Sequence, residues 1–113
     1  MAVVSPTTQI SNDLYSYIAI AASDTTLPLR LEGGWGLVMS VQVLDGGGSG
    51  FNSGTFTVQL SNDGTTWFTA KDINGNDVTF TANGGFEMST GARFIRGSAD
   101  GSIANVDMYV SFA

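Results

Sequence analysis

The amino-acid sequence predicts an all-β domain, an antiparallel β-sandwich of jelly-roll-like topology with eight or nine strands and an extended N-terminal arm. Three observations predict this fold. Apolar residues recur at every second position along most of the chain. Clusters of Gly, Asn and Asp interrupt this alternation about every ten residues, as in sandwiches and barrels. The connections are too short for the crossover helices that parallel strands need.

The alternation is clearest in three segments. In "TFTVQLS", Phe56, Val58 and Leu60 share one face of the expected strand, and polar residues share the other. The segments "LVMSVQVL" at 37–44 and "NVDMYVSF" at 105–112 alternate in the same way. Such half-buried strands are typical of antiparallel sheets. Further strands are expected at Leu14–Ala21, Leu27–Leu31, Thr66–Ala70, Asp77–Ala82, Phe86–Met88 and Ala92–Gly97.

The turns between these strands contain residues that tolerate a positive φ angle. "NGN" at Asn74–Asn76 and "NGG" at Asn83–Gly85 are typical of hairpin turns. In "SNDGTTWFTA", Asp63 can accept hydrogen bonds from its own turn, and Gly64 can adopt a positive φ. The whole stretch is therefore interpreted as a β-hairpin.

The segment "DGGGSGFNSG", Asp45–Gly54, differs from the other connections in length and composition. Five of its ten residues are glycine, and Phe51 is its only bulky side chain. We expect it to bury little and to form a mobile loop.

Residues 1–13 stand apart from the domain that we assign to residues 14–113. Val3 and Val4 precede Pro6, and polar residues follow as far as the first clear strand. Two interpretations remain open, a frayed terminus or an extended arm. In the second, a few apolar residues anchor the arm along a neighbouring subunit or a host surface by strand addition.

Composition excludes several classes of function. The 113 residues fit one domain, and they include no cysteine and no histidine. A disulfide framework and a thiolate metal site are therefore impossible, and the commonest general base is missing. The net charge is −6, with four basic residues, so binding to nucleic acid or to an anionic membrane is not expected. The N-terminus lacks the basic and apolar regions of a secretory signal.

We expect no catalytic residue, no cofactor and no metal site, and hence no enzyme. Ser61 has no imidazole to activate it. A pair of carboxylates in a cleft remains the one catalytic arrangement that the sequence alone leaves open.

The segment "DINGND" resembles the start of a calcium loop, with Asp72, Asn74 and Asn76 at its first, third and fifth positions. The glycine expected at the sixth position is Asp77, and the glutamate expected at the twelfth is Asn83. A plain hairpin turn is the better interpretation.

Two tryptophans and two arginines are the remaining candidates for a binding surface. Trp35 lies between glycines in "EGGWG" and is predicted to contact a partner, since tryptophan is favoured at interface hot spots. Trp67 suits hairpin packing, although either ring could stack on a sugar. Arg93 and Arg96 are expected on opposite faces of a strand. At least one of them would then face the inner layer and need a carboxylate or carbonyl partner. Two roles remain open, a structural bond from Arg93 or Arg96 to a loop, or an ion pair between subunits.

The motifs resemble three families. The hairpin is similar to the Asp-box of sialidases, S-x-D-x-G-x-T-W, but is one residue short between Asp63 and Trp67. It also resembles discoidin-type jelly rolls, which combine S-x-D-G-x-x-W with a downstream motif like "ARFIR" at Ala92–Arg96. Those domains bind glycans or lipids, and they are longer than this chain.

The third resemblance, over residues 46–113, is to small β-sandwich proteins of tailed-phage virions. The shared order is a Gly-rich loop, "GTFTVQLS", S-x-D-G-T-T-W, "VTFTANGGFEMSTGARFIRG" and a closing strand like "ANVDMYVSF". The resemblance implies a capsid decoration, or cement, protein on the virion exterior. It implies binding to the major capsid protein, often as a trimer, after synthesis in the host cytoplasm.

The interface expected for such a protein comprises Val3, Val4, Pro6, Trp35, Arg93 and Arg96. An alternative function is a carbohydrate-binding or host-attachment module on a phage head or tail fibre.

Overall fold

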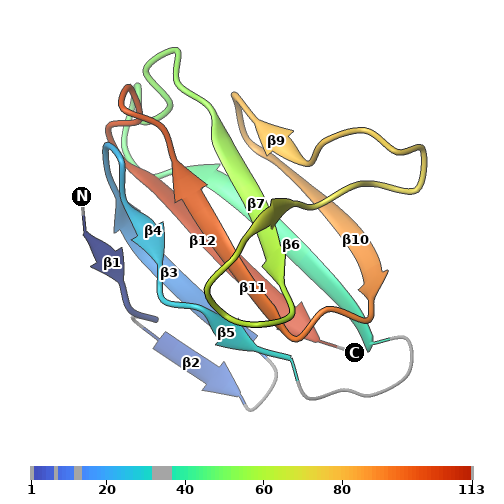
Figure 1. Cartoon of the computed structure of the whole chain (residues 1–113). Helices are drawn as coiled ribbons and strands as arrows, with labels where there is room; N and C mark the ends of the chain where they lie inside the picture. Colours follow the sequence, from blue (N-terminus) through green and yellow to red (C-terminus); the bar gives the residue numbers. More distant parts are fainter. Residues whose placement is uncertain (1, 7, 12–13, 32–36, 113) are drawn as a thin grey trace.

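The computed structural model describes residues 2–6, 8–11, 14–31 and 37–112. These residues form two β-sheets that pack face to face (Figure 1). The strands are β1 (Val3–Val4), β2 (Thr8–Ser11), β3 (Leu14–Ile20), β4 (Thr25–Thr26), β5 (Leu29–Arg30), β6 (Leu37–Asp45), β7 (Phe56–Ser61), β8 (Phe68–Thr69), β9 (Thr79–Phe80), β10 (Gly84–Thr90), β11 (Phe94–Ala99) and β12 (Val106–Phe112).

The strand order is that of a jelly roll. One sheet has five strands in the order β10-β6-β12-β3-β2. The other has seven, in the order β1-β4-β11-β7-β8, with β5 also paired to β11 and β9 also paired to β7. If β4 with β5, and β8 with β9, each count as one strand and the short β1 and β2 are set aside, eight main strands remain. The chain changes sheet at every connection between them except the hairpin from β7 to β8, as in two interlocked Greek keys. The predicted all-β sandwich with jelly-roll-like topology is therefore confirmed.

Each of the nine strands expected from the sequence has a counterpart, but the expected number was too low. The described residues contain twelve strands, because β1, β2 and β4 were not anticipated. β1 and β4 have two residues each, which is too short for an alternating pattern to be recognised.

The N-terminal segment pairs with both sheets of its own chain. β1 runs parallel to β4, with Val3 opposite Thr25 and Val4 opposite Thr26. β2 is antiparallel to β3. The described part of residues 1–13 is thus extended, as expected for an arm, but it forms edge strands on this domain.

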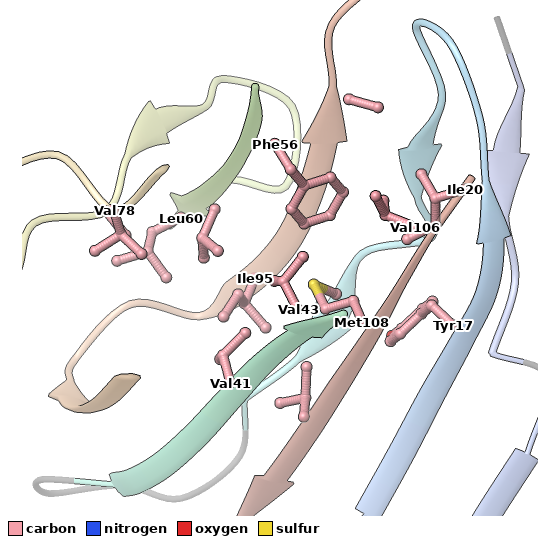
Figure 2. Packing of buried hydrophobic residues seen from close by; sticks show 14 of the residues in the cluster. Tyr17, Ile20, Val41, Val43, Phe56, Leu60, Val78, Ile95, Val106 and Met108 are labelled. Atoms are coloured by element: carbon pink, nitrogen blue, oxygen red, sulfur yellow. The ribbon is translucent and has the colours of Figure 1, made fainter. Parts of the chain in front are cut away.

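The core lies between the sheets and draws on both (Figure 2). Residues from β3, β6 and β12 in one sheet meet residues from β7 and β11 in the other, and Val78 closes one end. The labelled members are Tyr17, Ile20, Val41, Val43, Phe56, Leu60, Val78, Ile95, Val106 and Met108. Burial raises the pKa of Tyr17 to about 12, and nearby Tyr15 adds to this effect.

The long glycine-rich loop is packed, so the expectation that it buries little was wrong. Phe51 belongs to the core and is only 6% exposed. The Asp45 carboxylate accepts hydrogen bonds from the N–H groups of Gly47 and Gly50 at 2.8 and 3.1 Å. The Gly50 carbonyl in turn accepts the Asn105 N–H at 3.0 Å. The glycines let the loop approach the 100–105 turn closely, which composition alone does not reveal.

Replacement of Phe51 tests whether this loop belongs to the core. Phe51→Ala should lower the free energy of unfolding by about 3 kcal/mol, because it leaves a cavity beneath the loop. Phe68→Ala is the matched control, since Phe68 is 50% exposed, and it should cost about 1 kcal/mol or less. Equal losses in urea unfolding would contradict the packed loop.

Gly97 on β11 packs tightly against side chains from both sheets. A Cβ at this position would lie 2.8 Å from Phe56 Cε2 and 3.0 Å from Met108 Sδ. The Gly97 N–H donates to Thr26 Oγ1 at 2.8 Å, and the Thr26 side chain is fully buried. β4 pairs with β11 at Ser98, and β5 pairs with it at Phe94 and Ile95, so Gly97 lies between the two pairings. The Thr26 hydroxyl therefore provides a partner for the buried N–H of Gly97.

Gly97→Ala should therefore destabilise the domain. The added methyl group overlaps the Phe56 ring, and overpacking of this kind lowers the free energy of unfolding by about 1–3 kcal/mol. Gly91→Ala provides the control, because a Cβ at Gly91 meets no atom within 4 Å. Urea unfolding of both variants measures the difference, and an unchanged midpoint for Gly97→Ala would contradict the close packing.

Candidate interaction surface

The outer surface of the seven-stranded sheet carries two of the residues predicted for an interface. Val3 in β1 lies opposite Thr25 of β4 and is 54% exposed. Arg96 alternates with the buried residues Ile95 and Gly97 of β11, so it lies on the outer face. Neither arginine enters the inner layer, which corrects the prediction that at least one does.

Arg96 is held in place by two neighbours on that face. Its Nε donates to Gln59 Oε1 at 2.7 Å. Its guanidinium lies over the Trp67 ring, 4.3 Å from the centroid, in cation–π geometry. Partial burial lowers the pKa of Arg96, which remains a cation at neutral pH. One face of Trp67 is therefore covered by this chain's own side chain.

The other predicted interface residues are dispersed. Val4 packs against the core, and Pro6 is half-buried. Arg93 is exposed and precedes β11, and its carbonyl accepts the Leu31 N–H at 2.7 Å. Trp35 lies outside the described residues.

The hairpin expected at "SNDGTTWFTA" is confirmed, because β7 and β8 are antiparallel neighbours. Asp63 Oδ1 accepts hydrogen bonds from the Thr65 and Thr66 N–H groups at 2.9 and 2.7 Å, and from the Ser61 hydroxyl. Ser61 Oγ also accepts the Gly64 N–H, and Gly64 adopts a φ of 78°. The polar groups of this motif are occupied by the turn itself.

These hydrogen bonds lower the pKa of Asp63 well below its usual value, the Thr66 and Thr65 N–H groups contributing most. The pKa of Asp100 is lowered for the same reason. Its carboxylate accepts the N–H groups of Ser102, Thr55 and Ile103.

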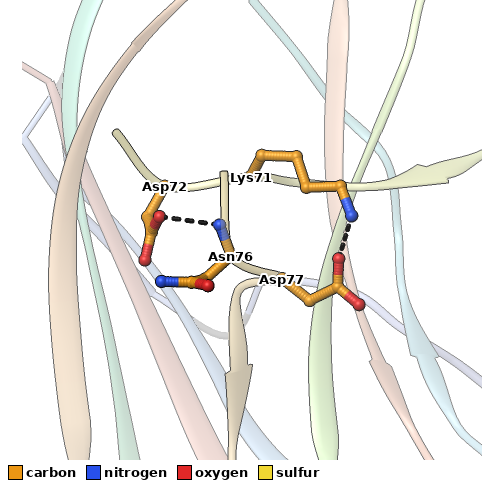
Figure 3. A network of polar contacts seen from close by, with 4 residues as sticks. All are labelled: Lys71, Asp72, Asn76 and Asp77. Carbon is orange, nitrogen blue, oxygen red and sulfur yellow. Dashed lines mark hydrogen bonds and ion pairs between the residues drawn. The ribbon is translucent and has the colours of Figure 1, made fainter. Parts of the chain in front are cut away.

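The calcium-like segment also forms a local turn (Figure 3). Asp72 Oδ1 accepts the N–H groups of Asn74 and Asn76, both at 2.9 Å. Lys71 and Asp77 form an ion pair across the turn. In the described part of the chain, no group of three or more acidic side chains is placed to hold a metal ion.

The outer face of the five-stranded sheet carries mostly uncharged residues. An open depression of about 510 Å³ lies where β6 meets β10, and a second of about 130 Å³ lies beside it. Ser40 and Glu87 border both depressions. Val38, 46% exposed, lines the second.

Charge is distributed unequally between the sheets. The five strands of the β10-β6-β12-β3-β2 sheet contain Asp45, Glu87 and Asp107 but no lysine or arginine. Asp107 accepts the Ala19 N–H at 2.9 Å, and Asp45 holds its loop. No hydrogen bond or ion pair joins Glu87 to any other described residue.

β10 forms the outer edge of this sheet (Figure 1). It has seven residues, whereas β2 at the opposite edge has four, and the edge strands β1 and β8 of the other sheet have two each. β10 contains no proline and no lysine, the residues that commonly protect an edge from further pairing.

This edge was not predicted from the sequence. "GGFEMST" was expected to be a three-residue strand at Phe86–Met88, and Glu87 was not considered as a binding residue. A usable signal was present, because the segment contains β-forming residues around a single charge. Its edge position depends on the order of the strands, which no short motif specifies.

Comparison with known proteins supports the fold and goes no further. No protein-family model and no curated protein sequence matches this chain. Among solved structures it is similar to the SPBc2 prophage-derived protein YomS, with a TM-score of 0.62 and 10% identity, covering 94% of this chain and 99% of that one. It is also similar to PirA, with a TM-score of 0.54 and 7% identity over 95% and 99% of the two chains.

In the described residues, no helix is long and apolar enough to cross a membrane.

The depressed pKa of Asp63 makes a testable contribution to stability. A carboxylate whose pKa is lower in the folded state stabilises the fold above its unfolded pKa, and this effect is lost as pH falls through the folded pKa. Asp63→Asn should therefore lower Tm at pH 7, and the difference from the wild type should shrink below pH 3.8.

Melting curves between pH 7 and pH 2 measure this difference. Glu87→Gln is the control, because it removes one exposed charge that forms no hydrogen bond within the described structure. A Tm difference for Asp63→Asn that stays constant across this range would contradict the role of the charge.

Proposed function

We propose that this chain is an accessory structural protein of a phage particle, which decorates the capsid exterior and bridges major capsid protein subunits. The observation that carries the proposal is the long edge of β10, which no other described strand pairs with, beside a mostly uncharged sheet face that holds an open depression. Such edges bind other chains by adding a strand.

The assignment to a phage particle draws on two further observations. The motif order of residues 46–113 resembles small virion sandwich proteins. YomS, whose fold matches over nearly the full length of both chains, is described as prophage-derived. We further propose a location on the virion exterior and a homo-oligomer, with a trimer favoured by the same resemblance.

A decoration protein needs no catalytic group, since it stabilises a shell through many modest contacts repeated on a lattice. The side chains most suited to chemistry have structural roles here. Ser61 and Asp63 bond within one turn, and Arg96 covers one face of Trp67. A non-enzymatic, protein-binding role is therefore proposed ahead of glycan binding.

Particles from the phage or prophage that encodes this sequence test the proposal. Mass spectrometry of purified virions should detect the chain in the capsid fraction after capsids and tails are separated. Capsids that lack the protein should bind it in co-sedimentation, and binding should raise their resistance to heat or osmotic shock, because it bridges subunits.

Two results would contradict this function. The first is a chain that is absent from purified virions and does not sediment with capsids. The second is specific binding of the isolated domain to an oligosaccharide array, abolished by Trp35→Ala or Trp67→Ala, which would favour the attachment module instead.

A further inference from the structure

The hydrogen-bonding phase of β6 determines which backbone groups of β10 are free. The Gly46 N–H, just after β6, donates to the Asn105 carbonyl at 2.9 Å, just before β12. Val106 is opposite Asp45, so Asn105 and Gly46 form a hydrogen-bonded pair. Bonding alternates along an antiparallel ladder, so even-numbered residues of β6 bond to β12 and odd-numbered residues bond to β10.

This phase assigns the free groups residue by residue. Val43, Val41 and Met39 of β6 are opposite Gly84, Phe86 and Met88, which are therefore bonded to β6. The intervening residues are Gly85, Glu87 and Ser89. Their N–H and C=O groups point in the plane of the sheet, away from β6 and toward the open edge. No hydrogen bond between these groups and other described residues is found.

We propose that the free edge of β10 is a strand-addition site for an extended segment of a partner protein that carries a lysine or arginine opposite Glu87. The inference deepens the proposed function by naming the edge that binds and the chemistry of the bound segment. The Gly85, Glu87 and Ser89 backbone groups supply a regular ladder for the added strand.

Charge complementarity favours a basic segment. Side chains of adjacent strands that lie directly opposite each other share a face, so a residue opposite Glu87 would project on the same outer face. Glu87 has no partner among the described residues, and no strand of its sheet supplies a cation. The depression beside Gly85 leaves room for the aliphatic part of a long basic side chain.

A second copy of this chain is a poorer occupant of the edge. Two antiparallel β10 strands related by a two-fold axis, with full overlap, would pair Gly85 with Ser89 and Glu87 with its own counterpart. Like charges directly opposite each other destabilise a sheet, and each copy already carries a net charge of −6.

A library of random nonapeptides displayed on yeast, sorted against the purified protein, tests the site. Enriched peptides should combine β-forming residues with a central lysine or arginine. Ser89→Pro removes one outward N–H without removing a bond to β6, so it should weaken their binding roughly tenfold or more. Ser89→Ala retains the N–H and should bind like the wild type.

Glu87→Lys provides a second variant that leaves the backbone unchanged. This variant should bind the enriched peptides more weakly than the wild type does. Peptides in which the central basic residue is replaced by glutamate should bind it well again. Thermal unfolding of each variant verifies folding, and Gly85→Pro can replace Ser89→Pro if the latter does not fold.

Three outcomes would overturn the inference: no enrichment, enriched peptides that bind Ser89→Pro as well as the wild type, or self-association that Ser89→Pro abolishes. The capsid assay separates this inference from the proposed function. Capsids that bind Ser89→Pro normally would refute the edge and leave the decoration role intact. If peptides bind β10 but the protein has no affinity for capsids, the strand-addition site would stand and the decoration role would be refuted.

Discussion

The phase of hydrogen bonding along β6 is the constraint on which the five-stranded sheet depends. β6 lies between β10 and β12, and each of its residues can bond to only one of them. Met39, Val41 and Val43 bond to β10 and direct their side chains into the core. A slip of one residue would expose all three, so the buried face and the free groups of β10 are fixed together.

The acidic residues of this chain are used mainly to hold turns. Asp45, Asp63, Asp72 and Asp100 each accept two or more backbone N–H groups, mostly from the few residues that follow. In Asp45, Asp63 and Asp72 these bonds all go to Oδ1, so one oxygen of each carboxylate is committed to its turn. Glu87 differs because it lies within a strand, where no turn amide can reach it.

The candidate site was only partly predictable. Arg96 was selected as a candidate from the sequence alone. Its side chain is held by Gln59 in β7 and by Trp67 in the following turn. Both residues come beside Arg96 only because β7 pairs with β11. Val3 was expected to contact another subunit, and it extends an edge of its own sheet. Glu87 was missed because its importance comes from the order of strands. A motif search finds residues close in sequence, whereas an interface on a sheet joins residues that the topology brings together.

The sequence by itself determined the all-β class, the hairpin at Asp63 and the approximate position of every long strand, although it gave β10 less than half its length. These features depend on local alternation and on residues that favour turns, so they can be recognised within about ten residues. Only the tertiary structure decided that Phe51 is buried, that β1 and β2 extend the two sheets, and that β10 is left as an open edge. Those outcomes depend on contacts between residues far apart in the chain, because a strand's neighbours are chosen by how two whole sheets bury their apolar faces against each other.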